Sequence, residues 1–229
     1  MSKIVEIIDL HKSYLDGDNR IHVLQGINLE IKAGDFLSIQ GASGTGKSTF
    51  LNVIGALDKF DEGDVVINGE SLKARKPSQL NNFRKKHLGF IFQYHYLLPE
   101  FTVIENAMMP LLLLKQPRAE AREQAKKILE KVGLGHRLDH YPAQISGGES
   151  QRVAVARAMV HNPPLILADE PTGNLDGANT ENFINLLNEL IEENNLTVLL
   201  VTHADDLAKT ARRQMVMKAG LLSEVSNLD

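Results

Sequence analysis

The fold of this chain is decided by the stretch Gly41-Ala42-Ser43-Gly44-Thr45-Gly46-Lys47-Ser48-Thr49. The apolar run 36–40 before it predicts a buried strand, and residues 50–54 after it predict a helix. Glycines allow the loop between them to point its backbone N–H groups at an anion, and the helix N-terminus adds partial positive charge. The spacing G-x-x-x-x-G-K-[ST] assigns Lys47 to the β- and γ-phosphates of a nucleotide and the Ser48 hydroxyl to Mg²⁺.

The composition narrows the classes of protein that fit. With 229 residues, 43% of them hydrophobic, the chain can bury one large core or one core with a subsidiary lobe. A net charge of -4 provides no global basic field, so we expect no nucleic-acid partner. The absence of cysteine excludes disulfides and thiolate sites and fits a reducing compartment such as the cytoplasm. The longest apolar run, 107–114, is far short of the roughly 20 residues of a membrane-spanning helix.

Hydrophobic periodicity divides the chain into strand-rich and helical parts. Alternation at 4–10 and 27–31 predicts half-exposed antiparallel strands, with a turn at 15–19. The pattern from 94 to 161 is helical. A strand that ends in a turn is expected at 64–69, and buried strands are expected at 89–93, 165–168 and 197–201. A helix at 183–191 can cross between the last two of these, and 215–220 predicts a hairpin strand. We therefore expect an α/β nucleotide-binding core, residues 1–93 and 163–229, interrupted by a helical part, residues 94–162.

Two carboxylates, Asp169 and Glu170, directly follow the apolar run 165–168. Ligands bind at this end of strands in open α/β sheets, and burying two adjacent acids is costly unless a cation or a reactant needs them. Asp169 is therefore assigned to Mg²⁺, through water, and Glu170 to orienting or deprotonating the attacking water. The plainer alternative is a pair of acids at a strand end that solvent reaches.

A second candidate anion site is Ser146-Gly147-Gly148-Glu149, which opens a helical run. Ser146 can cap this helix, and the two glycines leave backbone N–H groups accessible. On the residues alone, an ordinary N-cap explains the stretch as well as an anion site does. One nucleotide needs only one such site, so a second one fits a protein in which each site serves a different copy.

The phosphate loop, the Ser146–Glu149 stretch and the Asp169–Glu170 pair, in this order, resemble the ATPase subunits of ATP-binding cassette (ABC) transporters. The likeness covers nearly the whole chain, and the Ser-Gly-Gly signature separates this family from other P-loop proteins. It implies a single ABC ATPase domain, 1–229: a P-loop NTPase (RecA-like) α/β core with an N-terminal antiparallel β subdomain and an inserted α-helical subdomain. It also implies ATP and Mg²⁺ as cofactors and a head-to-tail homodimer, in which each ATP lies between the phosphate loop of one copy and the signature of the other.

The resemblance assigns further residues by their positions. Tyr14 matches the aromatic that stacks on adenine, Gln93 the residue that touches Mg²⁺ and the reacting water, and His203 the histidine that contacts the γ-phosphate. Residues 174–176, ending in Asp176, match the loop that communicates between the two sites. Without the family, a surface tyrosine and a capping or surface histidine are the plainer explanations. The implied nucleotide site comprises Tyr14, Gly41, Ala42, Ser43, Gly44, Thr45, Gly46, Lys47, Ser48, Thr49, Ser146, Gly147, Gly148, Glu149 and Asp176, with Glu170, His203 and Gln93 catalytic and Ser48, Gln93 and Asp169 at the metal.

The chain departs from the general family pattern at three positions. Glu149 replaces the more general glutamine, Ile145 replaces leucine, and Ala204 stands where aspartate is frequent after the histidine. The first of these is a variant that exporters of this sequence style also show. The last removes an acidic side chain next to His203.

Residues 93–106 and 109–112 lie where the family docks its integral membrane permease subunits, and an exposed aromatic and leucine stretch needs a partner to cover it. This stretch resembles the ATPases of lipoprotein-releasing systems of Gram-negative bacteria, which implies lipoprotein cargo and a peripheral place on the cytoplasmic face of the inner membrane. ATPases of macrolide or peptide efflux systems and of the cell-division complex share much of the pattern and remain alternatives. The basic run 84–87 is explained by a solvated helix end or by a lipid-headgroup contact.

Overall fold

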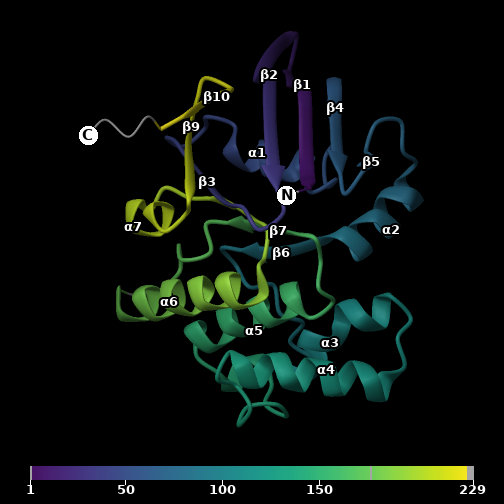
Figure 1. Ribbon diagram of the computed structural model, residues 1–229, viewed down its shortest axis with the longest axis vertical. Helices are drawn as coiled ribbons and strands as arrows, with labels where there is room; N and C mark the ends of the chain where they lie inside the picture. Colours follow the sequence, from purple (N-terminus) through teal and green to yellow (C-terminus); the bar gives the residue numbers. More distant parts are fainter. Residues whose placement is uncertain (1, 176, 226–229) are drawn as a thin grey trace.

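The computed structural model describes residues 2–175 and 177–225, and it contains two β-sheets with helices around them (Figure 1). The smaller sheet has the strand order β2-β1-β4-β5 and is antiparallel. Its strands are β1 (Lys3–Asp16), β2 (Asn19–Lys32), β4 (Glu62–Ile67) and β5 (Glu70–Ser71). The strands predicted at 4–10 and 27–31 are halves of this longer hairpin, because its turn needs only residues 17 and 18, with Gly17 at φ +60°.

The larger sheet has six strands in the order β10-β9-β3-β8-β7-β6. Strands β9, β3, β8, β7 and β6 are parallel, and β10 pairs antiparallel with β9, which confirms the predicted C-terminal hairpin. The bounds are β3 (Phe36–Gln40), β6 (Leu88–Phe92), β7 (Leu165–Asp169), β8 (Val198–Val201), β9 (Arg213–Lys218) and β10 (Leu221–Glu224). Parallel pairing brings the carboxyl ends of β3, β6, β7 and β8 to one edge of the sheet.

Seven α-helices and a 3₁₀ turn are found in the described part of the chain. Their bounds are α1 (Lys47–Ile54), α2 (Pro77–His87), α3 (Val103–Leu113), α4 (Arg118–Lys131), η1 (Pro142–Gln144), α5 (Gly147–Met159), α6 (Gly177–Asn194) and α7 (Asp205–Lys209). The pattern predicted only the end of α2, since just Phe83 and His87 of this polar helix are buried. None of the described helices combines the length and hydropathy that crossing a membrane requires.

The helical pattern predicted from residue 94 is wrong for residues 94–102, which form no helix. The reason is Asn106, a buried side chain on α3. Its Nδ2 donates to the carbonyl oxygens of Leu98, Phe101 and Thr102 at 3.1, 2.9 and 3.0 Å, and its Oδ1 accepts from Leu98 N at 2.8 Å. These bonds hold the segment in a compact loop in front of α3.

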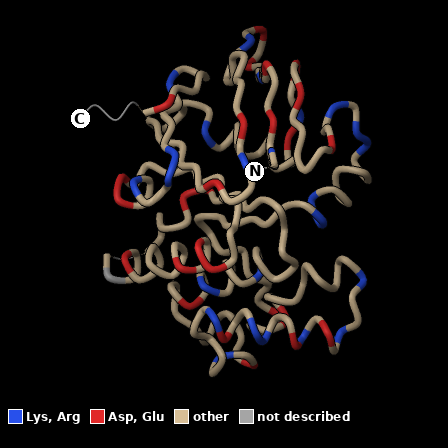
Figure 2. The backbone as a smooth tube through the Cα atoms, in the orientation of Figure 1, with Lys and Arg blue, Asp and Glu red and all other residues tan. Residues whose placement is uncertain are grey.

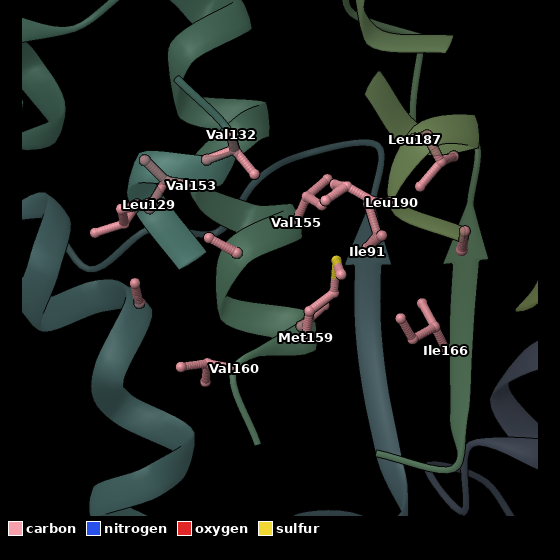
Figure 3. Packing of buried hydrophobic residues seen from close by; sticks show 14 of the residues in the cluster. Ile91, Leu129, Val132, Val153, Val155, Met159, Val160, Ile166, Leu187 and Leu190 are labelled. Carbon is pink, nitrogen blue, oxygen red and sulfur yellow. The ribbon is translucent and has the colours of Figure 1, made fainter. Parts of the chain in front are cut away.

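The hydrophobic core lies on both faces of the six-stranded sheet. Alternate residues of each strand point to opposite faces, so Leu37 and Leu199 belong to one cluster and Phe36 and Val198 to the other. The first cluster joins the sheet to α1 and the smaller sheet. The second joins it to α3, α4, α5 and α6, as the close packing around Met159 shows (Figure 3). The helices of residues 94–162 thus share a core with the sheet, and their separation as a subdomain stays a prediction.

Candidate functional site

The glycine loop between β3 and α1 faces a cavity of about 720 Å³ at the carboxyl edge of the six-stranded sheet. Residues that follow β3, β6, β7 and β8 converge there, so the parallel topology assembles the site from four separate parts of the sequence. The lining residues are Val23, Gly41, Ala42, Ser43, Gly44, Gly46, Lys47, Ser48, Thr49, Gln93, Glu170 and His203.

At two positions, the backbone of the loop has a conformation that favours glycine. Gly46 has φ +103°, and a methyl group there would lie 2.9 Å from the carbonyl oxygen of Val23. Gly44 has φ +79° with open space around it. The left-handed conformation at both positions disfavours any residue with a side chain. The backbone of this loop therefore has the glycine-dependent conformation that the sequence predicts.

Positive charge is concentrated at this loop. The Lys47 ammonium donates to the carbonyl oxygens of Gly41 and Ala42 at 2.7 and 2.9 Å, which holds it over the loop. The first turn of α1 has no acidic residue, so the partial positive charge of the helix N-terminus is not neutralised there. This arrangement of donors suits a polyphosphate.

The Asp169 carboxyl group at the end of β7 is suited to a cation. Burial raises its pKa, as does the neighbouring Glu170 carboxylate, while a hydrogen bond from Ser48 and the charge of Lys47 oppose the shift. Its Oδ1 is buried and has no hydrogen-bond partner among the described residues. A buried carboxylate oxygen with a vacant acceptor position, next to a serine hydroxyl, fits the oxygen ligands that Mg²⁺ prefers.

Glu170 is held by the segment that follows β8. Its Oε2 accepts hydrogen bonds from the Thr202 hydroxyl at 2.9 Å and from the His203 backbone N–H at 3.1 Å. Its Oε1 lies 2.7 Å from Nδ1 of His203, whose side chain is 71% exposed. Glu170 also has φ +46°, a conformation that is uncommon for residues other than glycine and that concentrates at functional sites. The two predicted catalytic side chains therefore touch.

Gln93 enters the same cavity directly after β6 and contacts the segment that follows Glu170. Its carbonyl oxygen accepts from Asn174 Nδ2 at 2.9 Å, and its own Nε2 lies 3.4 Å from Asn174 Oδ1. A methyl group at Gly173 would lie 2.7 Å from Gln93 Nε2, so a side chain there would displace the Gln93 amide. Asp176, the last residue of the predicted communication loop, lies outside the described residues.

Tyr14 does not line the cavity, although the predicted site included it. Its hydroxyl donates to Asp58 Oδ2 at 2.6 Å, and it also hydrogen-bonds Thr49 of the phosphate loop. Burial and the Asp58 carboxylate raise the pKa of this phenol. Tyr14 is still 41% exposed.

The Ser146–Glu149 stretch begins α5, and none of its residues lines the cavity of its own chain. Ser146 Oγ accepts from Glu149 N at 3.2 Å, and Ser146 N donates to Glu149 Oε2 at 2.8 Å. This reciprocal capping, helped by the Arg137 guanidinium 2.9 Å from Oε1, lowers the pKa of Glu149. Glutamate in place of the general glutamine is thus explained by its ion pair with Arg137.

Two functional residues were missed by the reasoning from sequence. Thr202 fixes Glu170, and its signal was a hydroxyl directly after an apolar strand. Gln151, on α5, is 1% exposed, and its Nε2 donates to the carbonyl oxygens of Phe92 and Pro171 at 3.2 and 2.9 Å. It therefore links the residues just before Gln93 and just after Glu170.

Comparisons with known proteins agree with this geometry. The family described as ABC transporter matches residues 24–173. The lipoprotein-releasing system ATP-binding protein LolD of Saccharophagus degradans is 45% identical over 221 residues, 96% of this chain and 97% of the relative, and LolD of Myxococcus xanthus is 46% identical over 96% and 99%. The dimeric structure of MJ0796, a bacterial ABC transporter cassette, has a TM-score of 0.87 and 38% identity, covering 98% of this chain and all of that one. A post-hydrolysis dimer of the same cassette with ADP and Pi matches equally well. Sequence, fold and site together show that this chain belongs to the ABC transporter family of ATP-binding cassettes.

Proposed function

We propose that this chain is the ATP-hydrolysing subunit of an ABC exporter that drives the release of lipoproteins from the inner membrane toward the outer membrane. The observation that carries the proposal is the convergence of Lys47, Gln93, Glu170 and His203 on one cavity. The cargo is inferred from the relatives, whose printed names are those of lipoprotein-releasing ATPases and which match nearly the full chain.

The residues of the cavity have different roles in the transfer of the phosphoryl group to water. Lys47 and the N–H groups of the loop stabilise negative charge on the phosphates. Glu170 accepts the proton of the attacking water, and its contacts with Thr202 and His203 fix the position of its carboxylate. His203 contacts the γ-phosphate, which its exposed ring can reach by rotating about the side chain. Ser48 and Asp169, together with Gln93, would hold Mg²⁺, which would neutralise negative charge on the phosphates.

A complete site needs a second copy of the chain. Within one chain, the N-terminus of α5 with Ser146 lies outside the phosphate cavity. A head-to-tail dimer brings the Ser146 hydroxyl and the N–H groups of Gly147 and Gly148 of each copy to the ATP held by the other. Asp176 is assigned to communication between the two sites. The dimeric relative with the same fold supports this arrangement.

We assign the docking of the membrane permease subunits to a groove of about 470 Å³ beside the six-stranded sheet. Its apolar lining includes Leu57 from the loop after α1, Phe90 from β6, and Met109 and Leu113 from α3. Next to it, residues 94–101 expose large side chains, with Tyr94 59% and Tyr96 65% exposed. An exposed aromatic and aliphatic surface of this kind marks a protein interface. Docking there would place the chain on the cytoplasmic face of the inner membrane as a peripheral subunit.

Two variants of the purified chain test the ATPase assignment. Glu170→Gln is expected to bind ATP, lose turnover and accumulate as a dimer on gel filtration, because binding is kept while the proton acceptor is removed. Lys47→Ala is expected to lose ATP affinity in calorimetry. Normal turnover by the first variant, or unchanged affinity of the second, would remove that residue from the site.

Co-purification tests the transport assignment. A tagged chain is expected to bring down a membrane subunit with a large periplasmic domain, together with lipoprotein. Recovery of cell-division components in place of these would contradict lipoprotein release while leaving the ATPase assignment intact.

A further inference from the structure

We propose that the loop before α2 and the exposed side of α2 bind the anionic phospholipid headgroups of the membrane. We define the basic surface as Lys73, Arg75, Lys76, Arg84, Lys85 and Lys86. Residues 71–99 contain these six cations and no Asp or Glu, in a chain whose net charge is -4, which leaves -10 for the remainder. Figure 2 shows the blue segments at both ends of α2.

Helix stability explains only half of this charge. Arg84, Lys85 and Lys86 lie in the last turn of α2, where cations interact favourably with the helix dipole. Lys73, Arg75 and Lys76 precede the first turn, where the dipole disfavours them, and that turn has no acidic residue to compensate. Of these three cations, Arg75 is compensated by its ion pair with Glu70, so the helix dipole leaves Lys73 and Lys76 unexplained.

The two arginines of the basic surface are occupied within the fold, whereas the lysines have no ion-pair partner among residues 2–175 and 177–225. Arg75 pairs with Glu70 at 2.8 Å and lies over the Phe83 ring, and Arg84 donates to the Ala56 carbonyl oxygen at 2.5 Å. No ion pair joins any of the four lysines to another residue in the described part of the chain. Four ammonium groups without an ion-pair partner on one surface suit a layer of phosphate groups better than a single shaped ligand.

The position of the basic surface supports a membrane as the partner. Arg84 and Lys85 line the groove assigned above to the permease subunits, beside Met109 and Leu113. The basic surface therefore borders the side of the chain that faces the bilayer, a step that rests on the proposed function. Negatively charged headgroups at that side attract the six cationic side chains of the basic surface. The rest of the chain, which is acidic, is kept away from the bilayer.

Vesicle sedimentation with the full chain tests the proposal. Wild type is expected to sediment with vesicles containing phosphatidylglycerol at about 0.1 M salt, and not with pure phosphatidylcholine or at about 1 M salt, where the Debye length falls to about 3 Å. Replacing three exposed lysines, Lys73→Gln with Lys76→Gln and Lys86→Gln, should weaken binding on the order of 100-fold, at about fivefold per lysine. The matched control replaces Lys126, Lys127 and Lys131 of α4 in the same way, and no residue of this helix lines the groove.

The outcomes separate this proposal from the proposed function. Equal loss in both triple variants, or equal binding to neutral vesicles, would overturn the basic surface as a lipid site. Binding of heparin or RNA without binding of vesicles would assign the surface to another polyanion and would also overturn it. Because the assay contains neither ATP nor a permease, a negative result leaves the ATPase and transport assignments standing.

A second set of contacts holds Tyr14, the tyrosine beside the nucleotide site. We also infer that Lys12 and Asp58 are positioning residues for Tyr14, which deepens its proposed role in stacking on the base. Lys12 is 7% exposed, and its Nζ lies 4.6 Å from the centroid of the Tyr14 ring. The same Nζ donates to Asp58 Oδ1 at 3.1 Å and to the Lys59 carbonyl oxygen at 2.6 Å. Asp58 Oδ2 accepts from the Tyr14 hydroxyl.

These contacts fix the Tyr14 ring at its edge and over one face. The ammonium covers one face of the ring, so a base can stack only on the other. Asp58 is in the loop that follows α1, and α1 begins at the phosphate loop. The helix therefore fixes the position of the Tyr14 ring relative to the phosphate site. The distance from base to triphosphate is thereby set.

Calorimetry with ATP and with tripolyphosphate tests this inference, because tripolyphosphate lacks the base. Lys12→Met is expected to weaken ATP binding about two- to fivefold, the size of a cation–π contact, without changing tripolyphosphate binding. Lys59→Met, an exposed neighbour, is the matched control and should change neither. Equal weakening for both ligands would indicate a merely structural role and overturn the inference. If Tyr14→Ala changes the ratio of ATP affinity to tripolyphosphate affinity and Lys12→Met does not, only the inference about Lys12 and Asp58 fails. If neither variant changes this ratio, the proposed stacking by Tyr14 fails as well.

Discussion

Replacing Gln151 by leucine removes the buried donor that joins two parts of the candidate active site. Its Nε2 donates to the Phe92 and Pro171 carbonyl oxygens at 3.2 and 2.9 Å. Leucine has a similar volume, so the loss is that of two hydrogen bonds rather than of packing. A neutral hydrogen bond contributes about 1 kcal/mol, and an acceptor left unsatisfied in the interior costs about 1–3 kcal/mol. We therefore expect the free energy of unfolding to fall by about 3 kcal/mol.

Urea unfolding and scanning calorimetry measure this loss. For a chain of this size, Tm falls by about 2–4 °C per kcal/mol, so a decrease of about 9 °C is expected with an unchanged m-value. ATP turnover should fall as well, because Gln93 and Glu170 lie next to the two carbonyl groups that lose their donor. Gln124→Leu, at an exposed position on α4, is the control and should change stability by less than about 0.5 kcal/mol.

Two results would refute the reasoning. Stability of Gln151→Leu equal to that of Gln124→Leu would show that the buried carbonyl groups find other donors. A clear loss of stability with normal ATP turnover would show that Gln151 stabilises the fold without positioning Gln93 and Glu170.

Three further predictions concern the loop, the metal site and the helix cap. Gly46→Ala should abolish ATP binding in calorimetry, because alanine is strained at φ +103° and its methyl group would meet the Val23 carbonyl oxygen; wild-type affinity would contradict this. Burial raises the pKa of Asp169, so this carboxyl group is protonated at a higher pH in the folded chain than in the unfolded chain. As pH falls, protons should therefore compete with Mg²⁺ for Asp169 at a higher pH than for an ordinary aspartate, so the Mg²⁺ affinity should decline there, and at neutral pH, without Mg²⁺, Asp169→Asn should melt above wild type; a lower Tm would oppose the assigned burial cost. Ser146→Ala should lower Tm by about 3 °C, from about 1 kcal/mol of lost capping, and weaken the ATP-dependent dimer of Glu170→Gln; a dimer of full strength would exclude Ser146 from the interface.

Much of the fold could be predicted because it depends on local periodicity. Residues 36–40 and 165–168 are strands, as their apolar runs predict, and the α4 helix follows its apolar face. Helix α2 was recognised only at its end, because a polar helix that buries Phe83 and His87 carries little amphipathic signal. Residues 94–102 were misassigned, because a single buried asparagine, Asn106, overrides their local preference.

By itself, the sequence determined the chemical groups: a glycine loop ending in Lys47, an acid pair after a strand, and a capped helix start at Ser146. These are properties of residues that are close along the chain, so neighbouring residues suffice to specify them. Only the tertiary structure decided which groups meet. Thr202 lies 32 positions from the Glu170 that it holds, Gln151 lies 59 from Phe92, and Asp58 lies 44 from Tyr14. Contacts over such separations depend on the order and register of the strands, because parallel pairing alone brings the ends of β3, β6, β7 and β8 to one edge.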